Sequence, residues 1–526
     1  MKLINLIFLS ILLFSCSQEQ VIEEEKVILP FEFQEISAEK KIEIALSKEY
    51  LQTLKLSDSS ISYIQEYYTK RNFIPRWIND STLSDIGLQL RNNFEKSYSF
   101  GLPTGRILAE NGENYIQAEI LLTYKLARIL SDLETGVINY DSLIQNPKSL
   151  ISIEKLNDFV IDSTHSICAQ FLSIGPKDST FQALSRGLTS ILETYPLDTT
   201  TFNIESVKYD TLFAFEKTRV ALVSKGYLLS DVSDSMDILA SLKKFQFDNG
   251  LKEDAVIGKY TSKALNESTY HKVERILLAM DKVRARKARP DKYIYINIPE
   301  YKLRLYINDS LKSEHNVVVG KIGNETPELT SKLRKIVVYP YWNLPYSISS
   351  KEILPHLKRN VDYMDKHNYK LLKNGEIIDP SSVDWSRVRQ NSFRYKIRQD
   401  PGPKNALGII KFDFYNVHSV YFHDTPSKSL FGADVRAYSH GCMRTQNPIE
   451  LAKIILDRDE RRNKFNIMTS DSLDTLFSRG ENYEIKLLQP IPIYIEYLSV
   501  TSKGKDMKMF IDVYGRDEEY LKIMRE

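Results

Sequence analysis

The sequence predicts a multidomain α+β protein with a helical N-terminal scaffold, a three-helix subdomain and a mainly β domain that carries an inserted helical subdomain. A chain of 526 residues is too long for one compact core, and about two to four domains are expected. Before Pro290 apolar residues recur at helical spacing, and after Pro290 they alternate as in strands. This change of period predicts the boundary between the helical part and the β part.

The chain begins with a segment that is typical of a bacterial lipoprotein signal. One positive charge, Lys2, precedes an apolar run from Leu3 to Phe14, which is too short to span a membrane. The run ends in "LFSC", which resembles a lipobox. We therefore predict a signal peptide at 1–15, cleavage before Cys16, and lipidation of Cys16. The alternative is an ordinary secreted protein in which Cys16 is left over.

Residues 16–40 are charged and without clear period, so they are interpreted as a membrane tether, although "VILPFEF" leaves a first strand or helix of the fold open. Residues 41–220 are predicted to form a helical scaffold. The stretch "YIQAEILLTYKLARILSDLETG" is apolar on nearly every side, which indicates a helix buried in a bundle.

Residues 221–289 are predicted to form a smaller three-helix domain. Leu239, Leu242 and Phe245 form one helical stripe, and Val273, Ile276, Leu277 and Met280 form another. In residues 290–475 the alternating segments "KYIYINIP" and "YKLRLYIND" indicate strands. A polar, helix-prone stretch at 347–393 interrupts these strands and is interpreted as an inserted subdomain. Residues 476–526 are expected to add further strands that pack on the body.

The charge balance argues against nucleic acid as a partner. The formal net charge is only +2, from 71 basic and 69 acidic residues, whereas a nucleic-acid surface needs a clustered excess of positive charge. Of the cysteines that remain, Cys168 lies among apolar residues and is interpreted as a core residue. An unpaired Cys442 in an oxidising compartment needs a chemical role.

The run "YFHDTPSKSLFGADVRAYSHGCMR" contains two histidines and a cysteine, which suit either a metal site or a thiol nucleophile with a base. The spacing of His423, His440 and Cys442 matches no standard zinc pattern, so no metal is predicted. A thiol needs a nearby base or cation to become a thiolate, and His423 follows a strand that ends near the "DTP" turn. Gly441 lets the chain bend, and the amides of Gly441 and Cys442 could then face an oxyanion.

These motifs resemble the YkuD-type L,D-transpeptidase catalytic domain, whose signature is a histidine, a variable loop and then Ser/Thr-His-Gly-Cys. The segments "YIYINIPEYKLRLY", "VVVGKIGNETPELTSKLRKIVVYPYWNLPYSISSKEILP" and "QDPGPKNALG" resemble the large, multidomain branch of that family. The three-helix domain resembles a peptidoglycan-binding domain, with a purely structural subdomain as the alternative. The resemblance covers most of the chain after residue 225.

The resemblance implies roles for individual residues. Cys442 would attack the carbonyl of the third residue of a peptidoglycan tetrapeptide stem, release D-alanine and form a thioester. His423 would be the base, oriented by a backbone carbonyl or by the side chain of Asp424. The site around them would be shaped by Ser439, His440 and Gly441, with Arg444, Tyr421 and Trp342 as candidates for substrate binding. Arg444 could instead pair with a carboxylate of the fold, and Tyr421 and Trp342 could be core residues.

The resemblance also implies substrates and a compartment. An amine of a diamino acid on a second stem would resolve the thioester and give a 3→3 crosslink, without a cofactor. The insertion at 347–393 would cap the substrate, and carbapenem-type β-lactams would acylate Cys442. The anchored protein is expected on the periplasmic side of the envelope, with the outer membrane favoured over the inner. The alternatives are a peptidoglycan hydrolase of the same fold and a non-catalytic wall-binding lipoprotein.

Overall fold

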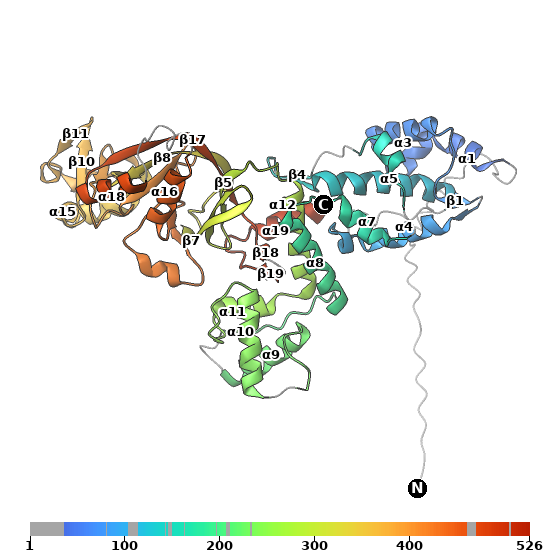
Figure 1. The fold of residues 1–526 in the computed structure, drawn as a ribbon, viewed down its shortest axis with the longest axis horizontal. Helices are drawn as coiled ribbons and strands as arrows, with labels where there is room; N and C mark the ends of the chain where they lie inside the picture. Colours follow the sequence, from blue (N-terminus) through green and yellow to red (C-terminus); the bar gives the residue numbers. More distant parts are fainter. Residues whose placement is uncertain are drawn as a thin grey trace, which may run out of the picture. The chain divides into compact units, whose positions relative to one another are not determined.

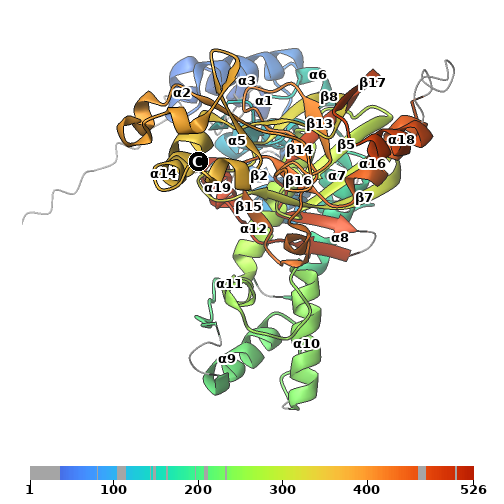
Figure 2. The ribbon, with the colours of Figure 1, turned by 90° about the vertical axis from the view of Figure 1, so that its left-hand side faces the viewer.

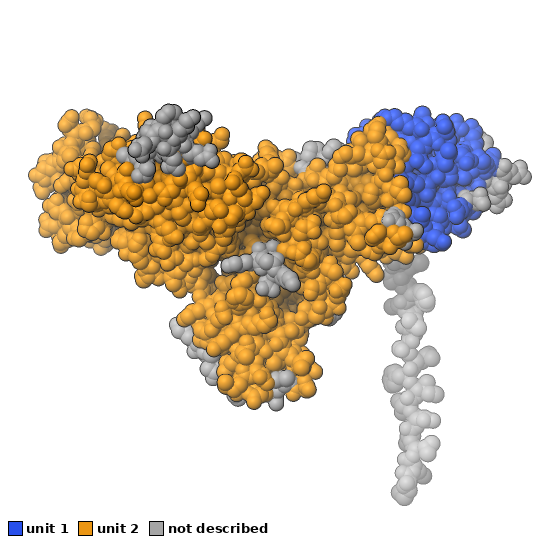
Figure 3. Space-filling view, in the orientation of Figure 1, with its two compact units in different colours: residues 1–88, 111–124 blue, residues 89–110, 125–526 orange. Residues whose placement is uncertain are grey.

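The computed structural model describes residues 36–79, 81–103, 114–142, 144–145, 150–161, 164–195, 197–206, 211–231, 234–459, 470–503 and 506–525. The predicted signal peptide, Cys16 and most of the predicted tether lie outside this part of the chain. Two compact units are present: residues 1–88 with 111–124, and residues 89–110 with 125–526 (Figure 3). Among the described residues, no helix combines the length and apolar character needed to cross a membrane.

The first unit is helical. Its helices α1 (Ala38–Ala45), α2 (Lys48–Thr53) and α3 (Asp58–Lys70) each follow a serine whose hydroxyl accepts a hydrogen bond from the amide three residues later. Such serine caps satisfy a helix-end amide that has no partner within the helix. The short strands β1 (Ile78–Asn79) and β2 (Thr82–Leu83) form a hairpin, and α5 (Tyr115–Thr135) contributes its residues up to Tyr124.

A buried carboxylate, that of Glu119, organises this first unit. It accepts hydrogen bonds from the Trp77 amide at 2.7 Å, the Arg76 amide at 2.8 Å and the Tyr68 hydroxyl at 2.8 Å. Burial raises the pKa of Glu119, and these hydrogen bonds oppose that rise because they favour the ionised form. The single side chain therefore joins α3, α5 and the segment before β1.

The second unit begins with further helices and short strands before the predicted three-helix domain. They are α4 (Asp85–Glu95, shared with the first unit), the 3₁₀ helix η2 (Ser97–Phe100), β3 (Ile138–Asn139), β4 (Ile144–Gln145), α6 (Ile153–Asp158), α7 (Ile167–Ile174) and α8 (Ser179–Thr194). Cys168 lies in α7, half-buried, and its thiol donates to the Ser99 carbonyl at 3.2 Å.

The helices α9 (Thr211–Ser224), α10 (Ser235–Asp248) and α11 (Lys259–Asn266) share one apolar cluster. The sequence predicts α12 (Thr269–Arg284) as the third helix of this domain, but no apolar residue of α12 lies in that cluster, and α9 takes this place instead. Figure 2 shows α9, α10 and α11 grouped together. The cluster includes Leu242 and Phe245 of the stripe predicted for α10, whereas Leu239 lies outside the cluster and Ile238 takes part in it.

A closed β-sheet forms the centre of the C-terminal part (Figure 1). Its strands are β5 (Lys292–Asn297), β6 (Lys302–Ile307), β7 (Ser310–Gly320), β8 (Leu329–Val338), β13 (Ile410–Phe414), β14 (Phe422–His423), β15 (Ala437–Ser439), β16 (Met443–Thr445) and β17 (Tyr483–Glu496). The order is β15-β7-β16-β14-β13-β8-β17-β5-β6, and an additional β6–β7 pairing closes it. Closure removes exposed sheet edges, which otherwise invite pairing with other chains.

Alternate residues of these strands fill a single apolar core. Ile410 and Phe412 of β13, Phe422 of β14 and Met443 of β16 are all fully buried in it. The helices α16 (Pro448–Asp457) and α18 (Ser470–Arg479) add Leu451 and Leu473 to the same core. Since strand side chains alternate, the residues between the core positions lie on the opposite face of the sheet.

The insertion has its own small sheet. The sequence predicts a helical subdomain at 347–393, whereas the structure has short helices together with a four-stranded sheet in the order β11-β10-β12-β9. These elements are β9 (Trp342–Asn343), α13 (Tyr346–Ile348), a π-helical turn (Ser349–Ile353), α14 (Leu354–Leu357), α15 (Tyr363–Lys366), β10 (Tyr369–Lys373), β11 (Glu376–Ile378) and β12 (Lys396–Gln399). Its separate core includes Leu357, Leu371 and Trp385.

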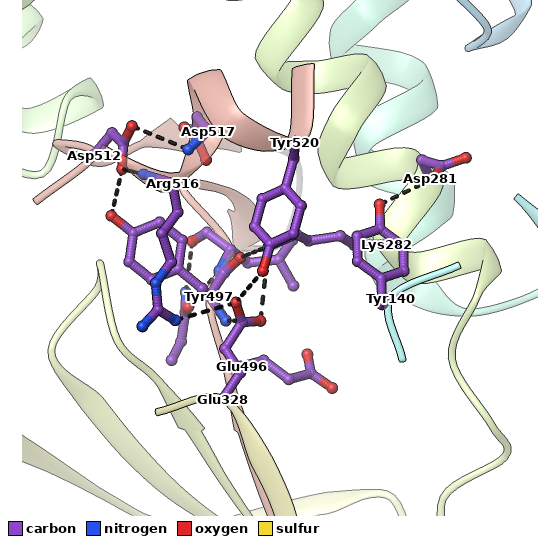
Figure 4. A network of polar contacts seen from close by, with 12 residues as sticks. Tyr140, Asp281, Lys282, Glu328, Glu496, Tyr497, Asp512, Arg516, Asp517 and Tyr520 are labelled. Carbon is purple, nitrogen blue, oxygen red and sulfur yellow. Dashed lines mark hydrogen bonds and ion pairs between the residues drawn. The ribbon is translucent and has the colours of Figure 1, made fainter. Parts of the chain in front are cut away.

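The C-terminal residues end in a helix that the sequence did not predict. After β17 come the hairpin β18 (Val500–Lys503) and β19 (Asp506–Met509) and then α19 (Arg516–Arg525). Figure 4 shows that Glu328 joins this region to the start of β8. Its carboxylate accepts from the Tyr520 hydroxyl at 2.7 Å, the Tyr497 amide at 3.0 Å and Arg516 at 3.3 Å. The tail is thereby tied to the sheet.

Candidate active site

Four side chains predicted for the site lie on one face of the sheet. Strands β14 and β16 are parallel neighbours that pair Phe422 with Met443 and His423 with Arg444. The Met443 amide donates to the Tyr421 carbonyl at 3.0 Å, so Tyr421 lies beside Cys442. Because Phe422 and Met443 point into the core, alternation directs Tyr421, His423, Cys442 and Arg444 to the opposite face.

The imidazole of His423 is buried and held by the main chain. Its Nδ1–H donates to the backbone carbonyl of Asp424 at 2.5 Å, which leaves Nε2 as the nitrogen that can accept a proton. Burial lowers the pKa of His423 to about 3, and the positive charges of Arg444 and Lys411 act in the same direction. The ring is therefore neutral at physiological pH.

The carboxylate of Asp424 is bound elsewhere. It accepts from the Ile409 amide at 3.1 Å and pairs with Lys428. Gly408, at φ +60°, packs so closely that an added Cβ would lie 2.2 Å from this carboxylate. Of the two groups considered for orienting His423, the structure places the Asp424 carbonyl against the ring.

The thiol of Cys442 lies in a largely desolvated setting. Burial raises its pKa, while hydrogen bonds from the Tyr421 amide and hydroxyl and the positive charges of Lys411 and Arg444 act against that rise. At neutral pH the thiol is therefore protonated, and a base is needed to form the thiolate.

Tyr421 connects the thiol to the insertion. Its hydroxyl is hydrogen-bonded to the Cys442 thiol and receives a hydrogen bond from the Trp342 indole, and burial raises the pKa of this tyrosine. The ammonium of Lys411 lies 4.0 Å from the Tyr421 ring centroid. Trp342, at the start of β9, is half-buried and packs against the core of the insertion, so it is both a packing residue and a neighbour of the site.

The "SHG" turn before Cys442 has a different hydrogen-bonding pattern from the predicted one. Gly441 has φ +103°, a conformation that favours glycine. Its amide donates to the Ser439 hydroxyl at 3.2 Å, and that hydroxyl donates to the Cys442 carbonyl at 2.5 Å. The prediction that the Gly441 amide faces an oxyanion is therefore wrong for this conformation. Among the described residues, the Cys442 amide has no hydrogen-bond acceptor.

Thr326 supports this turn and was not singled out as a site residue. It is fully buried, and its hydroxyl donates to the Gly441 carbonyl at 2.8 Å and accepts from the Gly320 amide at 2.9 Å. The only signal in the sequence is its place in "GNETPEL", between two predicted strands. Its role depends on contacts between distant segments.

The imidazole of His440 contacts the insertion. Its Nε2 lies 2.6 Å from a carboxylate oxygen of Glu352 in the insertion, and a third of the His440 side chain is exposed. In the described ranges, no group of three His, Cys, Asp or Glu side chains is arranged to hold a metal ion. His423, His440 and Cys442 thus do not converge as ligands.

Arg444 keeps its guanidinium beside the site. Within the part of the chain that the structure describes, it forms no ion pair with a carboxylate, and burial lowers its pKa while Cys442 has the opposite effect. The sequence left open that Arg444 pairs with a carboxylate of the fold, and no described carboxylate forms such a pair with it. Its fork of donors is therefore available to a carboxylate of a ligand.

Two parts of the chain match known protein families. Residues 291–466 match the family model of the L,D-transpeptidase catalytic domain, YkuD, and residues 62–188 match that of a scaffold domain. A Haemophilus influenzae protein named "Putative L,D-transpeptidase" is 34% identical over 231 residues, which are 43% of this chain and 45% of that protein. The match thus spans less than half the length of that relative.

Two solved structures are also similar. One is the carbamoyl enzyme of Ldtfm with avibactam, at 13% identity and a TM-score of 0.17, over 40% of this chain and 49% of that one. The other is an L,D-transpeptidase (Yku) from Stackebrandtia nassauensis, at 13% identity and a TM-score of 0.19, over 57% of this chain and 97% of that one. Over residues 291–466 the chain is thus similar in sequence to the YkuD-type L,D-transpeptidase catalytic domain.

Proposed function

We propose that this protein is a cysteine-dependent L,D-transpeptidase that forms 3→3 crosslinks in peptidoglycan. One observation carries the proposal. Cys442 and His423 lie on the same face of neighbouring parallel strands, and the hydrogen bond from His423 Nδ1 to the Asp424 carbonyl leaves Nε2 as the unprotonated nitrogen. A buried thiol with a raised pKa needs such a base.

The first half-reaction forms a thioester. The Cys442 thiol gives its proton to His423 Nε2, and the thiolate attacks the carbonyl carbon of the third residue of a tetrapeptide stem. The amide bond to the terminal D-alanine then breaks, and the departing amine takes the proton from His423. D-alanine is released, and the acyl group stays on Sγ.

The second half-reaction makes the crosslink. A side-chain amine of a diamino acid on another stem attacks the thioester carbonyl and gives a proton to His423. The C–S bond breaks, and the proton returns to Sγ, so the enzyme is regenerated. Water in place of the amine would give hydrolysis, which is the alternative reaction at the same nucleophile.

The donor groups around Cys442 support an acyl-transfer role. The Cys442 amide is the main-chain donor available to an oxyanion, and the Tyr421 hydroxyl lies at the thiol as a second polar donor. Arg444 is in place to hold a carboxylate of the donor stem. Trp342 and the insertion border the same region and would cover the bound stem.

Incubation with purified disaccharide tetrapeptide, followed by mass spectrometry of the products, tests this function. Dimers joined by a 3→3 bond, formed with loss of D-alanine, are expected from the native protein and not from Cys442→Ala. Loss of D-alanine without dimers would instead indicate a hydrolase. If neither product forms, the catalytic claim fails and a non-catalytic wall-binding protein is favoured.

We further propose that the protein is anchored by a lipid on Cys16 on the periplasmic side of the envelope, with the outer membrane favoured. The apolar run Leu3–Phe14 and the "LFSC" sequence support this. Metabolic labelling with an alkyne-tagged fatty acid is expected to mark the native chain and not Cys16→Ala. Labelling of Cys16→Ala at the same level would contradict the anchor.

Residues 221–289 are proposed to bind peptidoglycan. Support comes from the resemblance of "GYL", "FQ" and "VIG" segments and from the core that α10 and α11 share. Sedimentation of the full-length protein with purified sacculi is expected in the Cys442→Ala background. If disrupting the exposed surface of α10 leaves sedimentation unchanged, the domain has a structural role only.

A further inference from the structure

We propose that a basic cleft beside Tyr421 binds the carboxylates of the acceptor stem, the one whose amine resolves the thioester. This inference rests on the proposed transpeptidation and assigns a second substrate subsite to it. The cleft, here called the acceptor cleft, has a volume of about 640 Å³. It is lined by Arg334, Lys335, Lys411, Asp413, Phe414, Tyr415, Asn416, Ser419, Val420, Tyr421, Lys486, Leu487 and Pro490.

The lining carries four basic side chains and one carboxylate. Asp413 contacts two of the cations, Lys335 at 3.4 Å and Lys411 at 3.3 Å, and Lys335 also contacts Glu484 at 3.0 Å. Each ammonium has three donors, so these contacts hold the lysines in place while leaving donors for a ligand. The remaining excess of positive charge suits an anion with more than one carboxylate.

Strand register connects the acceptor cleft to the catalytic pair. Lys411 of β13 lies opposite His423 of β14, and Asp413 lies opposite Lys335 of β8. Lys335 in turn lies opposite Lys486 of β17. Neighbouring strands are roughly 4.8 Å apart, so Lys335 lies about 10 Å from the β14 strand, within reach of a peptide stem whose amine is at Cys442.

The position of the acceptor cleft favours the acceptor over the donor. In the row of paired residues, Arg444 lies on one side of His423 and Lys411 lies on the other. If Arg444 holds a carboxylate of the donor stem, the acceptor cleft is the basic surface left on the far side of the base. Neighbouring cations also favour the neutral form of an incoming amine, which is the nucleophilic form.

Separate measurement of the two half-reactions tests this assignment. The variant is Lys335→Gln combined with Lys486→Gln, which leaves Lys411 beside His423 untouched. Lys453→Gln is the matched control: Lys453 pairs with Asp474 at 2.7 Å, and its side chain is 35% exposed, against 32% for Lys335. The donor is disaccharide tetrapeptide, and the acceptor is a tripeptide stem, which has no D-alanine to lose.

We expect the rate of D-alanine release and thioester formation on Cys442 to stay within about twofold of the native protein. The KM for the tripeptide acceptor should rise about tenfold, with more thioester lost to hydrolysis, because two partly exposed charge contacts are lost. The control should keep the native values. Lys335→Arg should restore most of the acceptor binding when combined with native Lys486.

Other outcomes overturn the assignment in distinguishable ways. An unchanged acceptor KM would mean that the acceptor cleft does not bind this stem. An equal slowing of thioester formation would assign the cleft to the donor or to the fold. If the native protein forms a thioester but no crosslink, the assignment of the acceptor cleft fails, while Cys442 is still the nucleophile. If the native protein forms no thioester, the proposed function fails as well.

Discussion

The Nδ1–H of His423 donates to the backbone carbonyl of Asp424 at 2.5 Å, while the carboxylate of that aspartate accepts from the Ile409 amide and pairs with Lys428. A main-chain carbonyl fixes the ring tautomer but cannot supply a full negative charge to an imidazolium. In the proposed mechanism the reacting groups are thus a dyad of Cys442 and His423, and the third group only orients the imidazole.

Asp424→Asn is therefore expected to keep most of the activity. The substituted amide oxygen can still accept from Ile409, and the carbonyl that orients His423 is unchanged. We expect less than about a tenfold loss in kcat, with a stability cost of about 1 kcal/mol from the lost Lys428 contact. Steady-state kinetics and thermal unfolding measure both. A loss near 10⁴-fold, as for a triad acid, would contradict the dyad.

The reactivity of Cys442 should rise with pH without an acidic plateau. Burial raises the pKa of Cys442 and lowers that of His423 to about 3, so thiol and imidazole are both neutral between pH 5 and pH 8. Alkylation by iodoacetamide in a Cys168→Ala background should then increase about tenfold per pH unit up to beyond pH 8.5. A plateau below pH 7 would show a thiolate–imidazolium pair and refute this neutral state.

His440→Gln should affect catalysis far less than His423→Gln. His440 binds Glu352 of the insertion at 2.6 Å and has no contact with the thiol. We expect thiol acylation by a carbapenem to stay within about tenfold for His440→Gln and to fall at least about 100-fold for His423→Gln. Glu352→Gln is the control and should resemble His440→Gln. Equal losses for the two histidine variants would show that His440 also takes part in the reaction.

Ser439→Ala should destabilise the turn that precedes Cys442. Its hydroxyl, buried in the structure, joins the Gly441 amide to the Cys442 carbonyl. Removing it leaves buried polar groups without a partner, at a cost of about 1–3 kcal/mol. Thermal unfolding should show this loss, and Ser439→Thr should retain most stability because the hydroxyl is kept. An unfolding temperature of Ser439→Ala equal to that of the native protein would mean that these hydrogen bonds contribute nothing to stability.

The alternating pattern of the site strands could be predicted from the sequence, but the pairing of these strands with one another could not. The segment "VYFHD" is typical of a strand that ends at His423, and β14 does end there, with Phe422 in the core. The parallel pairing of β14 with β16 could not be predicted, because β14 has two residues and its partner lies beyond a loop. The contacts of Lys411, Thr326 and Glu352 with the site depend on that pairing and on distant segments.

Two local features were predicted wrongly for physical reasons. The Gly441 amide was expected to be free, but a serine two residues earlier can bond back to the main chain and does so here. Helix α19 was not predicted because few of its residues are apolar. Ion pairs of Arg516 with Glu325 and Glu328 and of Arg525 with Glu274 stabilise it from other segments, and such contacts leave no local pattern.

The most direct test of the account is to locate the acyl group after reaction with a tetrapeptide stem. The protein is quenched in acid during turnover, digested, and mapped by mass spectrometry. The account predicts a thioester on the peptide that contains Cys442, with one D-alanine lost per acyl group, in the native and Cys168→Ala proteins alike. An acyl group on Cys168, or turnover that persists in Cys442→Ala, would contradict it.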